Sequence, residues 1–85
     1  MSILPLRVTV EEVWGEVLLE LSDDLPVSEI KRQALALTRV RQDPSKYVVK
    51  FRGAELSDET ESLAHAGLVP NGALIVLARR RRPVR

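Results

Sequence analysis

Tyr47-Val48-Val49-Lys50-Phe51-Arg52-Gly53-Ala54-Glu55-Leu56 is the stretch of sequence that decides the fold. Its first half alternates between two sets of side chains, which is the period-2 pattern of a half-buried β-strand. The inward set is expected to be Tyr47, Val49 and Phe51, and the outward set Val48 and Lys50. Arg-Gly-Ala then predicts a turn, because glycine adopts a positive φ without steric cost. The final Glu-Leu predicts a short return strand that anchors Leu56.

An N-terminal β-hairpin is predicted before this stretch. Two segments alternate in the same way, with inward side chains at Leu6, Val8, Val10, Val17, Leu19 and Leu21. The intervening residues are polar except for Val13 and Trp14, and Gly15 can supply a positive φ there. Trp14 and Gly15 are therefore expected near the hairpin tip.

A helix is predicted from about Val27 to Thr38. Its apolar face is expected to comprise Val27, Ile30, Ala34 and Leu37, which are three, four and three residues apart. Pro26 presets φ at the helix start. Asp43-Pro44-Ser45 is the next stop signal, because proline disfavours helical geometry at the preceding residue.

The remainder predicts a polar loop, one helical turn over residues 62–66 capped by Ser62, and a final strand. Gly67 is expected to end the turn, Leu68 to enter the core, and Pro70-Asn71-Gly72 to form another turn. On the final strand the inward side chains are expected to be Leu74, Val76 and Ala78. The outward side chains are expected to be Ile75 and Leu77.

Three spaced motifs in this order resemble ubiquitin and the ubiquitin-like β-grasp proteins. They are Val27-x-x-Ile30-Lys31, Val49-x-Phe51-x-Gly53-x-x-Leu56-x-Asp58, and Leu63-x-x-x-Gly67-Leu68 followed by Gly72-Ala73-Leu74-Ile75-Val76-Leu77. The resemblance covers residues 6–79. It implies an α+β fold over residues 1–78, a mixed four- to five-stranded β-grasp sheet packed on one α-helix in β-β-α-β-β order. The implied strand order is 2-1-5-3.

The charge is unevenly distributed along the chain. Of 13 basic residues, five lie in a predicted flexible tail, residues 79–85: Arg79, Arg80, Arg81, Arg82 and Arg85. The other eight are outnumbered by 12 acidic residues. The tail allows three interpretations: a solvated tail or linker, an acidic protein partner, or binding to nucleic acid or acidic lipid. No aromatic residue is interleaved to stack on bases, so nucleic acid is the less favoured partner.

An outer-face interface is predicted if the strand order is the implied one. Val48, Ile75 and Leu77 would form an apolar spot edged by Lys50 and Arg7, favouring a larger, acidic protein partner. The alternative is ordinary scattered aliphatic surface. Trp14 is either a binding anchor or folds back over Val13. In the resemblance Lys50 occupies the centre of ubiquitin's apolar patch, so receptors for ubiquitin itself are not expected to bind well.

Catalytic and metal sites are not expected. There are no cysteines, so disulfides and thiolate metal sites are excluded. His65 lacks a nucleophile and orienting acid, since Ser62 is better explained as a cap and Asp58 is only close in sequence. The acidic pairs lie in turns and loops without a histidine beside them, so no metal site or cofactor is expected.

The function predicted from the sequence is a non-enzymatic, non-conjugated interaction module. Conjugated modifiers in the family that the chain resembles end in a diglycine, whereas the last glycine here is Gly72. Among relatives without a diglycine, it resembles small bacterial ubiquitin-like proteins of type VII secretion and β-grasp accessory subunits of multicomponent monooxygenases. A covalent modifier with unusual C-terminal chemistry and a tail-dependent binder of nucleic acid or acidic surfaces remain alternatives. No secretory signal or membrane span is recognised, so a cytoplasmic location is expected.

Overall fold

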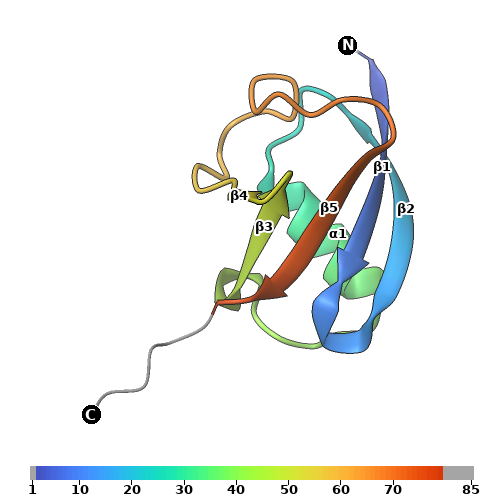
Figure 1. Cartoon of the computed structure of the whole chain (residues 1–85), viewed down its shortest axis with the longest axis vertical. Helices are drawn as coiled ribbons and strands as arrows, with labels where there is room; N and C mark the ends of the chain where they lie inside the picture. Colours follow the sequence, from blue (N-terminus) through green and yellow to red (C-terminus); the bar gives the residue numbers. More distant parts are fainter. Residues whose placement is uncertain (1, 80–85) are drawn as a thin grey trace.

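The structure is a computed structural model that describes residues 2–79. Its elements follow one another along the chain as shown in Figure 1. They are β1 (Ile3–Val10), η1 (Glu11–Val13), β2 (Gly15–Ser22), α1 (Ser28–Leu37), η2 (Pro44–Lys46), β3 (Tyr47–Phe51), β4 (Ala54–Glu55) and β5 (Gly72–Ala78).

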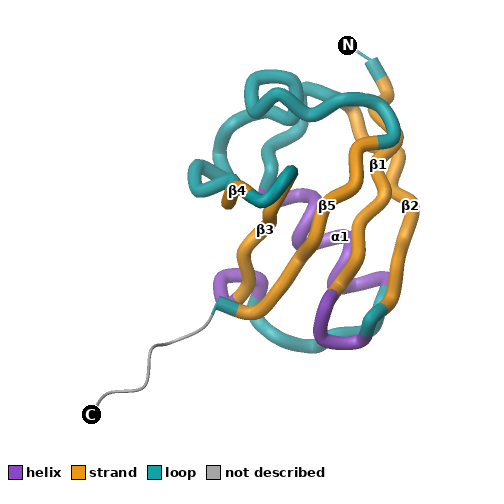
Figure 2. The backbone as a smooth tube through the Cα atoms, viewed as in Figure 1, coloured by secondary structure: helices purple, strands orange, loops and turns teal. Residues whose placement is uncertain are grey.

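The strands form one mixed five-stranded sheet in the order β2-β1-β5-β3-β4. β1 and β5 are parallel, whereas the other neighbours are antiparallel. The helix α1 covers one face, and the opposite face is turned toward the viewer in Figure 1. Figure 2 shows the long connection from β4 to β5 arching over the end of the sheet where β1 begins. The α+β β-grasp architecture and the predicted strand order are therefore confirmed.

The core lies between the sheet and α1. Tyr47, Val49 and Phe51 are buried as predicted, and the hairpin contributes Leu6, Val8, Val10, Leu19 and Leu21, with Val17 partly buried beside them. Leu63 and Leu68 enter the same core from the β4–β5 connection. Backbone hydrogen bonds of 2.9 Å, from Val27 N to Glu61 O and from Leu63 N to Leu25 O, join this connection to the start of the helix.

The helix face was predicted correctly except at its C-terminal end. Val27, Ile30 and Ala34 are buried, whereas Leu37 is 60% exposed and Leu35 is buried instead. The buried residues of α1 itself are Ile30, Lys31, Ala34 and Leu35. The buried face is therefore rotated about the helix axis, toward Lys31 and Leu35, from the face that the spacing predicted. Leu37 is the last helical residue and lies at the margin of that face. The predicted bounds, Val27 and Thr38, are the two cap positions.

Two further details of the turns and strand ends differ from prediction. The hairpin tip adopts its positive φ at Trp14 (50°), and Gly15 begins β2. Ala78 was expected inward but is exposed, because it is the last residue of β5 and lies beside open hollows in the surface, although its partner Tyr47 is buried. The cap at Ser62 is confirmed, since its Oγ accepts a hydrogen bond from His65 N at 3.1 Å.

No helix within residues 2–79 is long and apolar enough to cross a membrane.

Candidate protein-binding face

The outer face of the sheet is arranged around β5, which lies between β1 and β3. Ile75 pairs with Thr9 on one side and with Lys50 on the other. Two residues further along β5, on the same face, Leu77 pairs with Val48 of β3. The register therefore brings together four of the residues predicted for the interface, and the exposed apolar surface there is chiefly that of Ile75, which is 46% exposed.

A shallow hollow of about 490 Å³ opens at the lower end of this face. Its lining is Val48, Lys50, Glu55, Leu77, Ala78 and Arg79. Val48 was expected to be an exposed part of the apolar spot, but only 6% of it is exposed. It does not belong to the main core, so outer-face neighbours must cover it. Val48 is therefore the floor of the hollow, while Leu77 is half-buried beside it.

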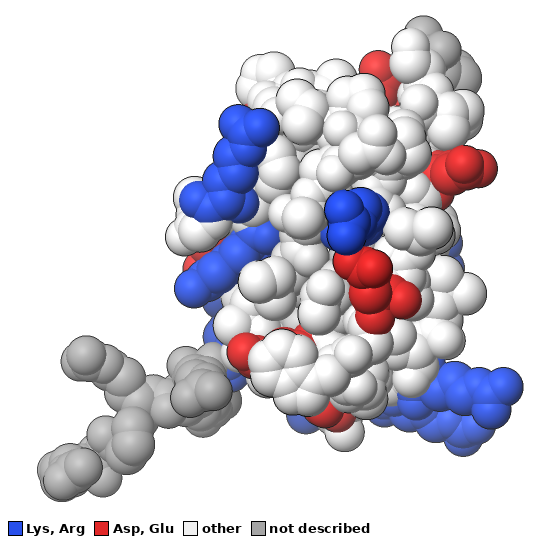
Figure 3. Space-filling model, turned by 45° about the vertical axis from the view of Figure 1, so that its right-hand side comes forward, with Lys and Arg blue, Asp and Glu red and all other residues white. Residues whose placement is uncertain are grey.

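The rim of the hollow carries charges of both signs, with an excess of positive charge. Lys50 pairs with Glu55 across β3 and β4. Arg79 is held at the rim by its backbone N–H, which donates to Lys46 O at 2.7 Å. Figure 3 shows mostly uncharged surface over the middle of the sheet, with basic side chains along the left margin of the view.

Arg7 does not edge this hollow. It pairs with Ala73 on β5, two residues before Ile75, and with Leu18 on β2. Its Nη2 lies 3.5 Å from Glu16 Oε2, so its charge is partly compensated within the sheet. The predicted cationic rim is thus divided, with Lys50 at the hollow and Arg7 in an ion pair on the β1–β2 side.

Trp14 projects from the hairpin tip into solvent. Its side chain is 79% exposed, so it does not fold back over Val13 and the sheet edge. The next residue, Gly15 of β2, pairs with Val10 of β1. Val10 pairs in turn with Val76 of β5, next to Leu77 at the hollow. Trp14 therefore lies at the same end of the sheet as the hollow, displaced sideways by about two strand spacings, roughly 10 Å.

Two residues on the outer face were not predicted as part of a site. Leu18 is 72% exposed on β2, and Glu55 lines the hollow from β4. The alternation of Leu18 with buried Leu19 could have indicated its exposure. Glu55 had no comparable signal, because its place depends on the pairing of β4 with β3.

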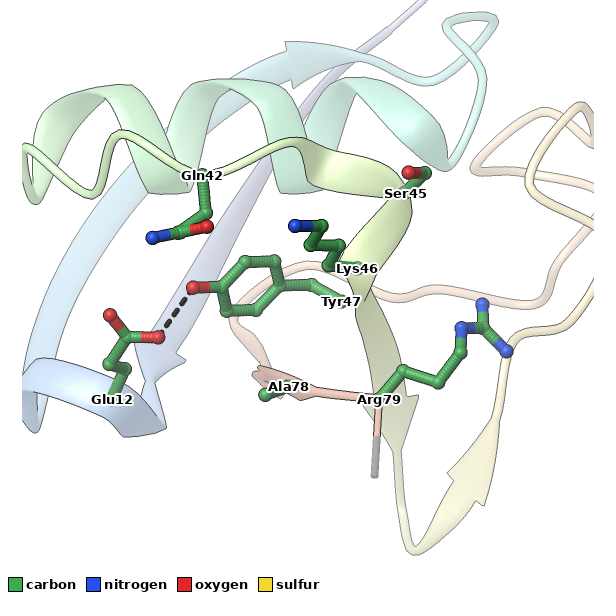
Figure 4. Close-up of a pocket in the computed structure, with 7 residues that line it drawn as sticks. All are labelled: Glu12, Gln42, Ser45, Lys46, Tyr47, Ala78 and Arg79. Carbon is green, nitrogen blue, oxygen red and sulfur yellow. Dashed lines mark hydrogen bonds between the residues drawn. The ribbon is translucent and has the colours of Figure 1, made fainter. Parts of the chain in front are cut away.

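A second, larger hollow of about 760 Å³ lies between the hairpin and the end of β5. Its lining is Glu12, Gln42, Ser45, Lys46, Tyr47, Ala78 and Arg79. The Tyr47 hydroxyl donates a hydrogen bond to Glu12, and Figure 4 shows Lys46 and Gln42 beside the ring while Arg79 points away from it. Burial, followed by the hydrogen bond to Glu12, raises the pKa of Tyr47 to about 12. The cationic groups diverge, so this hollow does not form a converging anion site.

Solved structures with the same fold are readily recognised. The ubiquitin of Caldiarchaeum subterraneum superposes with a TM-score of 0.77, at 17% identity, over 94% of this chain and 98% of that one. The C-terminal ubiquitin-like domain of mouse tubulin-specific chaperone e gives a TM-score of 0.76, at 16% identity, over 98% and 93% of the two chains. The chain has a ubiquitin-like fold.

A further structure with the same fold is the UBL domain of Plasmodium falciparum Dsk2, with a TM-score of 0.72, 18% identity and coverage of 92% of this chain and 100% of that domain. No family model matches the sequence, and no curated protein matches it. The ubiquitin-like neighbours therefore establish the fold.

On this ubiquitin-like fold the neighbours of His65 include Glu61 and Ser62. His65 Nδ1 contacts the Glu61 carboxylate, so one of the acidic residues does have a histidine beside it, contrary to the expectation from the sequence. The His65 side chain is exposed, whereas that of Glu61 is partly buried. Ser62 Oγ accepts the backbone N–H of His65 and so acts as a cap. Hydrogen bonds from Thr60 hold the pKa of Asp58 below its usual value. Within residues 2–79 no group of three or more potential ligands gathers to hold a metal ion.

The predicted basic tail is only partly within the described structure. Arg79 is exposed at the rim of the hollow. Arg80, Arg81, Arg82 and Arg85 lie outside the described residues.

Proposed function

We propose that this ubiquitin-like chain is a non-enzymatic interaction module that docks a larger protein through the hollow on its outer sheet face. The observation that carries the proposal is an apolar floor, Val48 and Leu77, beside the partly exposed Ile75. An apolar centre with a polar rim is the usual anatomy of a protein interface. The tubulin-specific chaperone and Dsk2 neighbours are ubiquitin-like domains of larger proteins, which supports a module of this type.

The partner surface is proposed to be acidic around an apolar centre. Lys50 and Arg79 both line the hollow, against the single acid Glu55. Neither Lys50 nor Arg79 forms an ion pair with any residue in the described part of the chain. Opposite charge on a partner would steer its approach and fix its orientation. The other four arginines of the 79–85 tail would add to the positive charge of the chain.

Trp14 is proposed as a second anchor for the same partner. Tryptophan is enriched among residues that dominate binding energy, because it buries a large area with few rotatable bonds. Its φ of 50° is uncommon for a bulky residue. The hairpin tip is nevertheless held in place, since Glu12 accepts a hydrogen bond from the Tyr47 hydroxyl and the backbone N–H of Trp14 donates to Glu11 O at 3.2 Å. A preorganised, exposed tryptophan at the hollow's end of the sheet suits this role.

Site-specific photocrosslinking tests the proposal before the partner has been identified. A benzophenone amino acid at Ile75 should crosslink one predominant protein in cells of the native host. The same group at Ala36, exposed on the helix, should not. With the purified partner, the double variant Ile75→Ser/Leu77→Ser should bind at least about tenfold more weakly, since each lost aliphatic anchor removes about 1–2 kcal/mol.

Ile3→Ser is the matched control, because Ile3 is 63% exposed at the far end of β1. It should leave affinity unchanged. Equal crosslinking from Ile75 and Ala36, together with unchanged affinity of the double variant, would assign docking to another face. Lys50→Glu and Arg79→Glu should slow association and reduce its dependence on salt if the partner is acidic.

A further inference from the structure

The edge strand β2 presents an open row of backbone hydrogen-bonding groups. It is eight residues long and stands at one end of the strand order, pairing only with β1 among the described strands. In an antiparallel edge strand, alternate residues direct their N–H and C=O groups away from the sheet. A long open edge of this kind is a template for pairing with another extended chain. The other edge strand, β4, has only two residues.

The outer side of β2 carries a defined pattern of side chains. Glu16, Leu18 and Glu20 are exposed in alternation, and Leu18 is 72% exposed. On the inner side Leu19 and Leu21 are buried. A strand added to this edge would therefore meet one aliphatic group flanked by a carboxylate on either side. Glu16 is partly compensated by Arg7, whereas Glu20 forms no ion pair with any described residue.

A second copy of this chain does not suit the edge. Two antiparallel β2 strands can bring their Leu18 side chains together in only one register. That register places Glu16 of each copy directly opposite Glu20 of the other, and like charges directly opposite one another are destabilising. Registers shifted by one pair place Leu18 against a carboxylate. The sequence of β2 therefore disfavours self-pairing while leaving the edge open.

We propose that β2 accepts an extended basic segment of another protein by strand addition, with an aliphatic residue opposite Leu18 and Lys or Arg opposite Glu16 and Glu20. Main-chain hydrogen bonds would supply affinity, and the alternating side chains would supply specificity. The carboxylates that oppose a second copy become favourable cross-strand pairs with such a segment. The hollow and this site lie on opposite sides of β1. The hollow favours an acidic partner, whereas β2 favours a basic one. Binding at β2 does not depend on the proposed docking through the hollow.

The experiment uses the full chain and an acetylated, amidated peptide, Thr-Lys-Val-Leu-Val-Lys-Thr, followed by amide NMR shifts and hydrogen exchange. The peptide should shift β2 amides and protect alternate ones. Glu20→Gln should weaken its binding about two- to fivefold, the worth of one cross-strand charge pair. A Glu-Val-Leu-Val-Glu peptide with the same threonine ends should bind markedly more weakly. Ile75→Ser/Leu77→Ser, which alters only the hollow, should leave peptide binding unchanged.

Backbone methylation distinguishes strand addition from simple charge attraction. Only one alternating set of peptide N–H groups can point toward β2. Methylating either the leucine and lysine nitrogens or the valine nitrogens should abolish binding in one case and spare it in the other. Equal affinities for the two methylated peptides would overturn the proposal, as would shifts centred on β3 and β5, or no shift of β2 at millimolar peptide.

Discussion

The ammonium group of Lys31 lies 2.7 Å from Glu59 Oε1, inside the fold. It also donates hydrogen bonds to the carbonyl oxygens of Pro44 and Tyr47, each at 2.8 Å. The Lys31 side chain is only 4% exposed, so its charge is balanced almost entirely by these three oxygens. One side chain of α1 thereby joins the helix to the start of β3 and to the β4–β5 connection.

Replacing Lys31 by methionine should destabilise the protein by about 2–4 kcal/mol, because a partly buried carboxylate and two carbonyls would lose their common donor. Urea unfolding followed by circular dichroism measures the loss. Arg32→Met is the control, since Arg32 forms a surface ion pair with Glu29 and is 62% exposed. Equal losses of unfolding free energy in the two variants would show that the buried Lys31 network contributes no more to stability than a surface ion pair.

Tyr47 should make stability depend on pH in the alkaline range. Burial and the hydrogen bond to Glu12 raise its pKa from 10.0 to about 12 in the folded protein. The neutral phenol is therefore favoured by folding, and its contribution is complete below pH 10 and declines as the pH rises through 12. The difference in unfolding free energy between wild type and Tyr47→Phe should shrink over that range. A constant difference across that range would show that folding does not raise the pKa of the Tyr47 hydroxyl.

Val49 tests the inward set of side chains on β3. It is completely buried in the core. Val49→Ala should cost about 2–3 kcal/mol, from lost burial and the cavity left behind. Val69→Ala is the matched control, because Val69 is 39% exposed and outside the core. Chemical denaturation of both variants should separate them by at least ~1 kcal/mol, and similar losses would contradict the assignment of faces.

Most of the core could be predicted from the sequence because the relevant patterns are local. Alternation in β1, β2, β3 and β5 identified most of the inward side chains, and the resemblance of the ordered motifs to ubiquitin-like proteins implied the fold class. The errors occurred where an element ends or where neighbours decide burial. Leu37 continues the helical spacing but lies at the last residue of α1, and Ala78 continues the strand alternation but is the last residue of β5, beside open hollows in the surface. Periodicity does not indicate where the covering element stops.

The candidate site was predictable only in part. Ile75, Leu77, Val48 and Lys50 were correctly assigned to adjacent strands, since the implied strand order determines their neighbours. Their exposure was not, because Val48 is covered on the outer face and forms the floor of the hollow. The pairing of Arg7 with Glu16 depends on the hairpin register, which is a property of two strands together.

The sequence by itself determined the elements and most of the inward side chains, because these follow short-range periodicity, and its spaced motifs implied the β-grasp fold through their resemblance to ubiquitin-like proteins. Only the tertiary structure decided which outward groups remain available to a partner. The charge of Lys31 on α1 is matched by Glu59 from the β4–β5 connection, and Tyr47 reaches Glu12 across a sequence separation of 35. Such contacts depend on how distant segments pack, and no local pattern specifies them.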